Sequence, residues 1–334
     1  MLTLEEKREL LDRLNSSGNG LTNKLNELGL PKATYYRWRN RYEKYGIEGL
    51  KMKPKTPNNI WNKLSAAEQE RVKVVIKAHP ELSARLIAVK ITDEEDFYVC
   101  ESSVYRILKS EGLLQPRAVD IPAAQEWKVK TTKPDQIWQC DATNYFVVGW
   151  GYYKQITALD DYSRNVVAWD LYPDETCRSI SWTIEKAVEE ARKLGHLKDG
   201  KAPMLLSDNG SGFKASELEI MLSMHGIHHI FGKPYHPQTQ GKIERFHRNI
   251  KGEVCLIVYC SPEELKAAVA KSIDRYVHTP HKAHKNVCPL DVYMGRKEEV
   301  LEKRRIKKQL TLERRKRYNS GKGNGSGSTD EVSK

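Results

Sequence analysis

The spacing of apolar residues changes near residue 135, and this change restricts the folds that the chain can adopt. Through residues 1–114 the apolar residues follow helical spacing, which predicts a series of helices. Beyond residue 135 they alternate with polar residues in short runs, which predicts strands. We therefore expect all-helical units followed by a mixed α/β domain.

The strand-rich part begins with "QIWQCDATNYFVV", which has two different faces. Trp138, Cys140 and Ala142 lie on one face, whereas the other face is polar and carries Gln139, Asp141 and Thr143. Two more strands follow in "YYKQITALDDYSRNVVAWDL". The remaining order is a helix over 177–194, the strand "APMLLSD", a helix over 215–225, the strand "IHHIFG" and a last helix to about residue 259. This order predicts three antiparallel strands first and parallel additions later.

The first 50 residues contain a pattern that is typical of DNA-binding domains. A short helix ends at Gly29, and Pro31 suits the first turn of a second, basic helix. Helix, glycine-containing turn and basic helix form the helix-turn-helix pattern, whose second helix enters the major groove. The candidate DNA-contacting residues are Lys32, Thr34, Tyr35, Arg37, Arg39 and Arg41. The alternative is an ordinary helical hairpin with a solvated basic face.

A second helical unit is expected over residues 62–114. Ser65 could cap its first helix, with Glu68 in the capping-box position three residues later. Its last helix, in "CESSVYRILKSEGLL", offers Ser103 and Arg106 to DNA by the same argument. The argument is weaker here because "DEEDF", at residues 93–97, is acidic.

The net charge of +12 is concentrated toward the two ends of the chain. It is +4 over residues 1–120, zero over 121–250 and +8 over 251–334. Basic ends around a neutral middle suggest an anionic polymer held from both sides, although a basic tail on a globular protein would give the same totals. Six scattered cysteines without a C-x-x-C pair are typical of a reducing cytosol.

Three acids occupy positions that suggest a metal site. Asp141 is on the polar face of the first strand, Asp208 ends a buried strand, and Glu244 lies beside the apolar stripe of the last helix. Converging carboxylates suit hard divalent cations, and two Mg²⁺ ions about 3.5–4 Å apart can stabilise both oxygens of a phosphoryl displacement. Each acid could instead act separately, as a salt-bridge partner, a turn former or an i,i+4 partner of Arg248.

Four stretches around the three acids form a recognisable set, with 35 residues between Asp208 and Glu244: "WQCDATNY", "ITALDDYSRNVVAWDL", "LLSDNGSGF" and "PYHPQTQGKIERFHRNIK". With these stretches, residues 135–250 resemble the retroviral-integrase type catalytic core of bacterial insertion-sequence transposases. The later stretch "HTPHKAHKNVCPLDVYMG" is similar to the family's C-terminal stretch, except that Thr279 precedes Pro280 where an arginine is usual.

This resemblance implies a fold, a site and a reaction. It implies a ribonuclease H-like α/β core and makes Asp141, Asp208 and Glu244 the catalytic metal ligands, with Asp141 shared between two Mg²⁺ ions that Mn²⁺ could replace. It also implies cleavage at a transposon end and direct attack of the freed 3′-hydroxyl on target DNA, without a covalent protein–DNA intermediate.

The resemblance also ranks the neighbouring residues. It implies a site-shaping or DNA-contacting role for the motif positions Asn209, Gly210, His236, Gln240 and Lys242. Apart from the resemblance, the basic residues around Glu244 would attract the DNA that the acids alone would repel, and these are Lys242, Arg245, His247 and Arg248, with Lys242, Arg245 and Arg248 as the candidate DNA contacts. Asp160 and Asp161, the rival acids in the "DDYSR" turn, would be structural.

The predicted organisation is therefore a chain of seven segments. In order they are a helix-turn-helix domain (1–50), a linker (51–61), a second helix-turn-helix domain (62–114), a linker (115–134), the catalytic core (135–260), a C-terminal helical and basic region (261–318) and a disordered tail (319–334). The basic stretch at residues 301–318 either contacts phosphates nonspecifically or is a solvated charged helix.

The function that these expectations favour is DNA transposition. The expected partners are double-stranded DNA, as transposon ends and target, and further copies of the chain in a dimer or larger assembly on DNA, with no membrane involved. The expected location is the bacterial cytoplasm, at the nucleoid. A DNA-binding regulator or a nuclease that cuts without joining are the alternatives.

Overall fold

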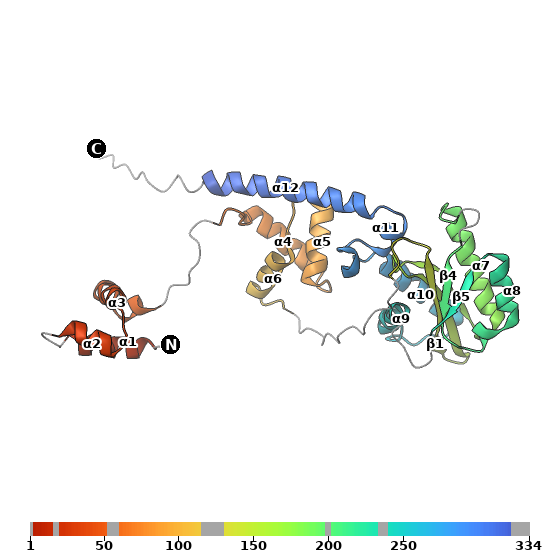
Figure 1. Cartoon of the computed structure of the whole chain (residues 1–334), viewed down its shortest axis with the longest axis horizontal. Coiled ribbons are helices and arrows are strands. Elements are labelled where there is room, and N and C mark those ends of the chain that lie inside the picture. The colour runs from red at the N-terminus through yellow and green to blue at the C-terminus, as the bar shows by residue number, and fades with distance from the viewer. Residues whose placement is uncertain are drawn as a thin grey trace. The chain divides into compact units, whose positions relative to one another are not determined.

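The structure is a computed structural model that describes residues 3–15, 20–51, 60–114, 130–197, 202–232 and 240–321 (Figure 1). The chain divides into two compact units, Met1–Trp61 and Asn62–Lys334. We describe each unit by itself.

The first unit is helical, as the sequence predicts. It contains α1 (Leu4–Asn15), α2 (Leu21–Glu27), α3 (Lys32–Tyr45) and the short 3₁₀ helix η1 (Gly46–Leu50). Gly29 has a φ of 62°, a left-handed conformation that favours glycine and ends α2. Pro31 immediately precedes the first residue of α3. The core is small and consists of Leu11, Leu14, Leu25, Tyr35 and Leu50.

The second unit begins with three more helices, α4 (Ala66–Ala78), α5 (Ala84–Glu94) and α6 (Glu101–Ser110). Ser65 and Glu68 form the predicted capping box at the start of α4, in which each side chain accepts from the other residue's backbone N–H. The three helices share an apolar core that includes Val72, Ile87 and Phe97. These helices correspond to the second helical unit that the sequence predicts.

A five-stranded sheet follows, composed of β1 (Ile137–Val147), β2 (Gly151–Asp160), β3 (Val166–Tyr172), β4 (Met204–Ser207) and β5 (His228–Phe231). Its spatial order is β3-β2-β1-β4-β5. The pairs β1–β2 and β2–β3 are antiparallel, whereas β1–β4 and β4–β5 are parallel. The predicted topology of antiparallel strands with later parallel additions is confirmed.

Helices cover both faces of this sheet. One apolar core joins it to α7 (Cys177–Lys193) and α8 (Ser216–Met224), and a second core joins it to α9 (Gly241–Val254) and α10 (Pro262–His278). The polar face of β1 is therefore largely covered too, and Gln139 and Thr143 are both buried while Asp141 is half-buried. The last core helix ends at Val254 rather than near residue 259, and Ile257, which the longer helix would have contained, is exposed.

The C-terminal region contains η4 (Lys282–His284), α11 (Pro289–Tyr293) and the long helix α12 (Lys297–Gly321). Figure 1 shows α12 lying along α4 and α5. Arg304 donates to both carboxylate oxygens of Asp93, at 2.7 and 2.6 Å. Further along α12, the Nε atom of Arg315 lies 3.2 and 3.1 Å from the two carboxylate oxygens of Glu68, and both side chains are buried.

These contacts change the interpretation of the basic C-terminal stretch. Several of its cations bind acids or carbonyls of the second helical unit, so this stretch is neither wholly solvated nor wholly available to phosphates. The helix also extends past the predicted start of a disordered tail at residue 319, and Asn319 donates to the Lys63 carbonyl at 3.0 Å. Residues 322–334 of the predicted tail lie outside the described residues.

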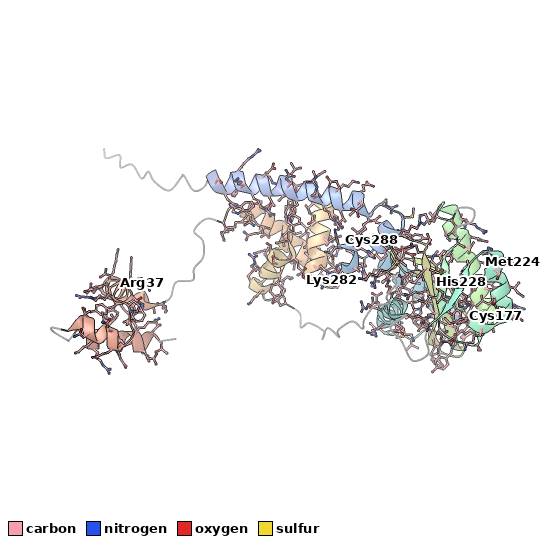
Figure 2. All side chains as sticks on the ribbon, viewed as in Figure 1. Arg37, Cys177, Met224, His228, Lys282 and Cys288 are labelled. Carbon is pink, nitrogen blue, oxygen red and sulfur yellow. The ribbon has the colours of Figure 1, made fainter. Side chains whose placement is uncertain are left out.

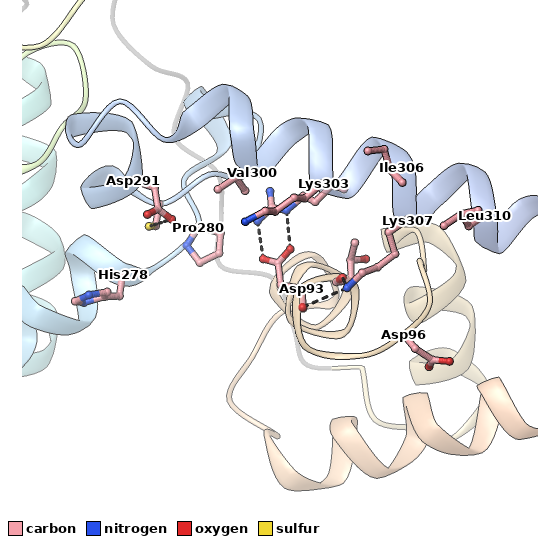
Figure 3. Close-up of a pocket in the computed structure, with 13 residues that line it drawn as sticks. Asp93, Asp96, His278, Pro280, Asp291, Val300, Lys303, Ile306, Lys307 and Leu310 are labelled. Carbon is pink, nitrogen blue, oxygen red and sulfur yellow. Dashed lines mark hydrogen bonds and ion pairs between the residues drawn. The ribbon is translucent and has the colours of Figure 1, made fainter.

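A groove of about 690 Å³ lies where α12 approaches the end of α5 (Figure 3). Its lining includes Asp93 and Lys307 from the two sides, and Lys307 donates to the Glu95 carbonyl at 2.7 Å. His278 of α10 and Asp291 of α11 also line it. None of the three candidate metal ligands borders this groove.

Candidate active site

The parallel pairing of β1 with β4 brings two of the three acids to the same level of the sheet. Gln139 of β1 pairs with Leu206 of β4. Asp141 lies two residues after Gln139, and Asp208 lies two residues after Leu206. Asp141 is half-buried and Asp208, just past the end of β4, is exposed. Burial and the charges of both acids raise the pKa of Cys140, which precedes Asp141 in β1.

The third acid, Glu244, is in the first turn of α9 at the solvent-accessible edge of its packed face. Partial burial and the nearby charge of Asp141 raise its pKa, and Arg248 opposes this shift. His247, one turn along, lies with Nδ1 3.3 Å from Asp141 Oδ2 and Nε2 3.4 Å from the hydroxyl of Thr157. Since Thr157 is the cross-strand partner of Asp141, the start of α9 lies over this point of the sheet.

His247 is a site residue whose role the sequence interpretation missed. It was grouped with the basic residues that attract DNA, yet it is buried and contacts an acid of the site. Its spacing from the buried Ile243, Phe246 and Ile250 is that of one helical face, and this signal could have revealed its inward position.

A buried network connects the start of α9 to the turn after β2. Gln139 donates to Asp161 Oδ1 at 2.7 Å and accepts from the backbone N–H of Ile243 at 3.1 Å. Lys242 donates to Asp161 Oδ2 at 2.7 Å and to its carbonyl at 3.0 Å, and Thr131 donates to Oδ2 at 2.6 Å. The ammonium of Lys242, expected to contact DNA, is therefore held by Asp161 in this structure.

The neighbouring acid, Asp160, is also satisfied internally. It accepts from the backbone N–H groups of Asp135 and Ser163 at 2.8 and 2.7 Å, and from the Ser163 hydroxyl. Its burial raises the pKa of its carboxyl group to about 7. Both rival acids thus have hydrogen-bond partners within the protein, and those of Asp161 include residues of β1 and α9.

The loop after β4 holds two of the predicted site-shaping residues. Asn209 donates to the Gly232 carbonyl at 2.9 Å, which joins this loop to the end of β5. The backbone N–H of Gly210 donates to Asp208 Oδ1 at 3.0 Å, and a Cβ at this position would lie 3.1 Å from that oxygen. Gln240 is buried at the start of α9, and His236 lies outside the described residues.

The three acids do not form one closed cluster in this structure. Asp141 and Glu244 interact electrostatically, and Asp208 stands level with Asp141 on the adjoining strand. Across the described ranges, no three His, Cys, Asp or Glu side chains lie close enough together to hold a metal ion. The donor types nevertheless suit a hard cation, because all three acids offer carboxylate oxygens.

The predicted DNA-contacting residues differ in their accessibility. On α3, Lys32, Arg37 and Arg39 are exposed, and Figure 2 shows Arg37 among the side chains of this unit. Thr34 and Arg41 are half-buried. Tyr35 was a wrong choice as a DNA contact, because its side chain is 1% exposed within the core of the first unit.

The predicted DNA-contacting residues of the second unit lie on α6 and α9. On α6, Arg106 is exposed, and the Ser103 hydroxyl lies 3.2 Å from Cys100 Sγ. On α9, Arg245 and Arg248 are both exposed on the same helix as Glu244. The cations of α9 are therefore accessible from solvent at the same helix end as this acid.

Comparison with protein families assigns most of the sheet-containing part of the chain. Residues 131–237 match a family model described as an integrase core domain, and residues 225–289 match a second model with the same description. Residues 34–108 match a model described as a homeodomain-like domain.

Individual relatives agree with these matches. The chain is 24% identical over 244 residues to the transposase for transposon Tn552 of Staphylococcus aureus, which covers 66% of this chain and 50% of that protein. It is 29% identical over 123 residues to the Gag-Pro-Pol polyprotein of Simian retrovirus SRV-2, covering 35% of this chain and 6% of the polyprotein. The chain thus spans half or less of the length of these relatives.

One solved structure to which the chain is similar is the catalytic core domain of BIV integrase. It is 23% identical with a TM-score of 0.37, and the match covers 49% of this chain and 97% of that domain. Among the helices that the structure describes, none combines the length and apolar character needed to cross a membrane.

Proposed function

We propose that the chain is a DNA transposase of the DDE transposase and integrase superfamily, because residues 131–237 and 225–289 match models described as integrase core domains. The proposed reaction is cleavage at the 3′ ends of a transposon, followed by joining of those ends to target DNA through direct transesterification. The observation that carries the proposal is the position of the acids: Asp141 and Asp208 are level on adjoining parallel strands, with Glu244 on the helix over Asp141.

The three acids would hold two divalent cations, Mg²⁺ or Mn²⁺, with Asp141 shared between them. The raised pKa of Glu244 supports this assignment. Repulsion from the Asp141 carboxylate contributes to the shift, after burial, and a cation between the two carboxylates would remove that repulsion. When bound, the ions would lower the pKa of an attacking water or hydroxyl and neutralise charge on the phosphate.

The surrounding residues orient the acids. The backbone N–H of Gly210 fixes one oxygen of Asp208, and His247 lies against one oxygen of Asp141. The bonds from Gln139 to Ile243 and Asp161 fix the start of α9, and with it the height of Glu244 over the sheet. These residues are positioning residues, since each acts through an acid or through the helix that carries one.

The exposed cations would bind the DNA on which the acids act. Arg245 and Arg248 flank Glu244 and would contact the phosphate backbone near the reacting bond. On α3, Lys32, Arg37 and Arg39 would contact the transposon end, and the homeodomain-like match to residues 34–108 supports a DNA-binding role for this region. Two ends must be joined in one event, so a dimer or larger assembly on DNA is expected.

A strand-transfer assay tests the proposal. The substrate would be the inverted repeats that flank the gene, with Mg²⁺ or Mn²⁺, and the readout is joined product on a gel. Asp208→Asn and Glu244→Gln should each lower joining by at least about 10²–10³-fold, because an electrostatic group acting on the reacting phosphate is lost. Glu217→Gln, an exposed acid on α8, is the matched control and should retain activity.

The same assay separates the alternatives. Cleavage without joining would identify a nuclease, and binding without any reaction would identify a DNA-binding regulator. Joining by Asp208→Asn at the level of the Glu217→Gln control would refute the assignment of the acids.

A further inference from the structure

Exposed apolar side chains gather at one end of the sheet, at the β1–β2 hairpin and the connection from α9 to α10. We call this surface the hairpin patch and define it by Phe146, Val148, Trp150, Tyr152, Leu256, Ile257 and Val258. Their exposed fractions run from 48% for Val148 to 82% for Leu256. Single exposed apolar residues are ordinary on protein surfaces, but seven in two adjoining segments are not.

The two segments are held next to each other. The backbone N–H of Val148 donates to the carbonyl of Tyr259 at 3.0 Å, which fixes the connection against the hairpin. Tyr259 is itself buried, and its hydroxyl donates to the Val254 carbonyl at 2.9 Å. Phe146 and Tyr152 are cross-strand partners whose rings meet edge to face, with centroids 5.3 Å apart. The patch is therefore preformed on an ordered scaffold.

The patch also lacks charge in a chain that is rich in it. Neither "FVVGWGY", residues 146–152, nor "CLIV", residues 255–258, contains a charged residue, although 30% of the chain is charged. A surface for nucleic acid would require cations here, because phosphate contacts dominate such interfaces. Aromatic residues and the absence of charge are instead typical of the centre of protein–protein interfaces.

The size of the patch matches one half of a small symmetric interface. Three aromatic side chains of about 150–250 Å² each, exposed by more than half, contribute roughly 350 Å². The four aliphatic side chains raise the total to roughly 600 Å², at the upper end of the largest patches on monomers. Two such patches would bury about 1,200 Å², which reaches the lower limit for a stable protein–protein interface.

We propose that the hairpin patch binds the hairpin patch of a second copy of this chain, in a two-fold symmetric contact. A self-complementary contact needs only one surface of this composition, which is what the sheet end supplies. This dimer forms without DNA, and the inference does not depend on the proposed transposase activity.

Sedimentation velocity of the full chain without DNA tests the inference. The measurement covers the micromolar range at high salt, so that bound nucleic acid is removed and repulsion between the basic chains is screened. The variants are Trp150→Lys and Ile257→Lys in the patch. Met224→Lys is the matched control, because Met224 is 81% exposed on α8 and receives the same charge. Circular dichroism checks that all three variants are folded.

The expected result is a dimer for the wild-type chain and for Met224→Lys. Each patch variant should dimerise at least about a hundredfold more weakly, because every substitution occurs twice in a symmetric contact and places a charge in its apolar centre. A wild-type chain that remains monomeric overturns the proposal, as does a dimer that both patch variants leave unchanged. In that case the partner of the patch would be another part of this chain or a different protein, and not a second copy.

Discussion

The buried ion pair between Arg315 and Glu68 should determine how firmly α12 holds the second helical unit. The two side chains are 7% and 8% exposed, and Arg315 also donates to the Tyr98 carbonyl at 2.7 Å. Arg315→Met keeps the length of the side chain but leaves the Glu68 carboxylate buried without its main partner. Removing one member of a buried pair costs about 3–5 kcal/mol, so α12 should detach from α4 in this variant.

Hydrogen exchange of the α4–α6 amides and urea denaturation measure this effect. Arg317→Met is the control, because Arg317 is exposed on the same helix and should change the free energy of unfolding by less than about 0.5 kcal/mol. The double variant Arg315→Met with Glu68→Gln should recover much of the loss, since glutamine still supports the capping box but carries no charge. Equal free energies of unfolding for Arg315→Met and Arg317→Met would refute the reasoning.

Three further predictions concern the buried acid Asp160, the hydrogen bonds of Gln139 and the proposed metal ions. Burial raises the pKa of Asp160 to about 7, so the protonated carboxyl group stabilises the fold fully below pH about 4, and this stability is lost as the pH rises through 7. Urea denaturation at a series of pH values should show the wild type losing stability relative to Asp160→Asn between pH about 4 and 7. Equal pH dependence of the unfolding free energy in the two proteins would contradict this. Gln139→Leu removes the donor to Asp161 Oδ1 and the acceptor of the Ile243 N–H, while Asp161 Oδ2 keeps Lys242 and Thr131. This variant should lower the unfolding free energy by about 1–3 kcal/mol together with strand transfer, and an unchanged Tm would argue against the network. Removal of divalent cations by a chelator should abolish the joining of transposon ends to target DNA. Mg²⁺ or Mn²⁺ should restore joining fully, and Ca²⁺ alone should not. Joining in excess chelator would exclude the metal assignment.

The strand topology could be predicted because each strand has a local signal. Alternation in "QIWQCDATNYFVV" and the apolar run before Asp208 identify β1 and β4 without knowledge of their neighbours. Alternation could not show that the polar face of β1 is covered by α9. Gln139 is buried there because it joins Asp161 to α9, and this contact crosses more than a hundred positions of sequence.

Two other differences have related causes. Tyr35 was assigned to the DNA surface as part of the basic helix that follows Pro31, but it is buried with Leu25 in the core of its own unit. The packing of α12 could not be predicted from apolar spacing, because much of its contact with the second helical unit is made by Arg304, Lys307 and Arg315. Charged contacts between distant segments leave no periodic signal in either segment.

The distance along the chain between Glu68 and Arg315 has a consequence during synthesis. The two residues are 247 positions apart. At roughly 5–20 residues per second, Arg315 leaves the ribosome about 12–50 s after Glu68. Throughout that interval α4, α5 and α6 have only their own apolar core to stabilise them, and the Glu68 carboxylate lacks Arg315. The attachment of α12 to this unit is therefore a late event in the maturation of the chain.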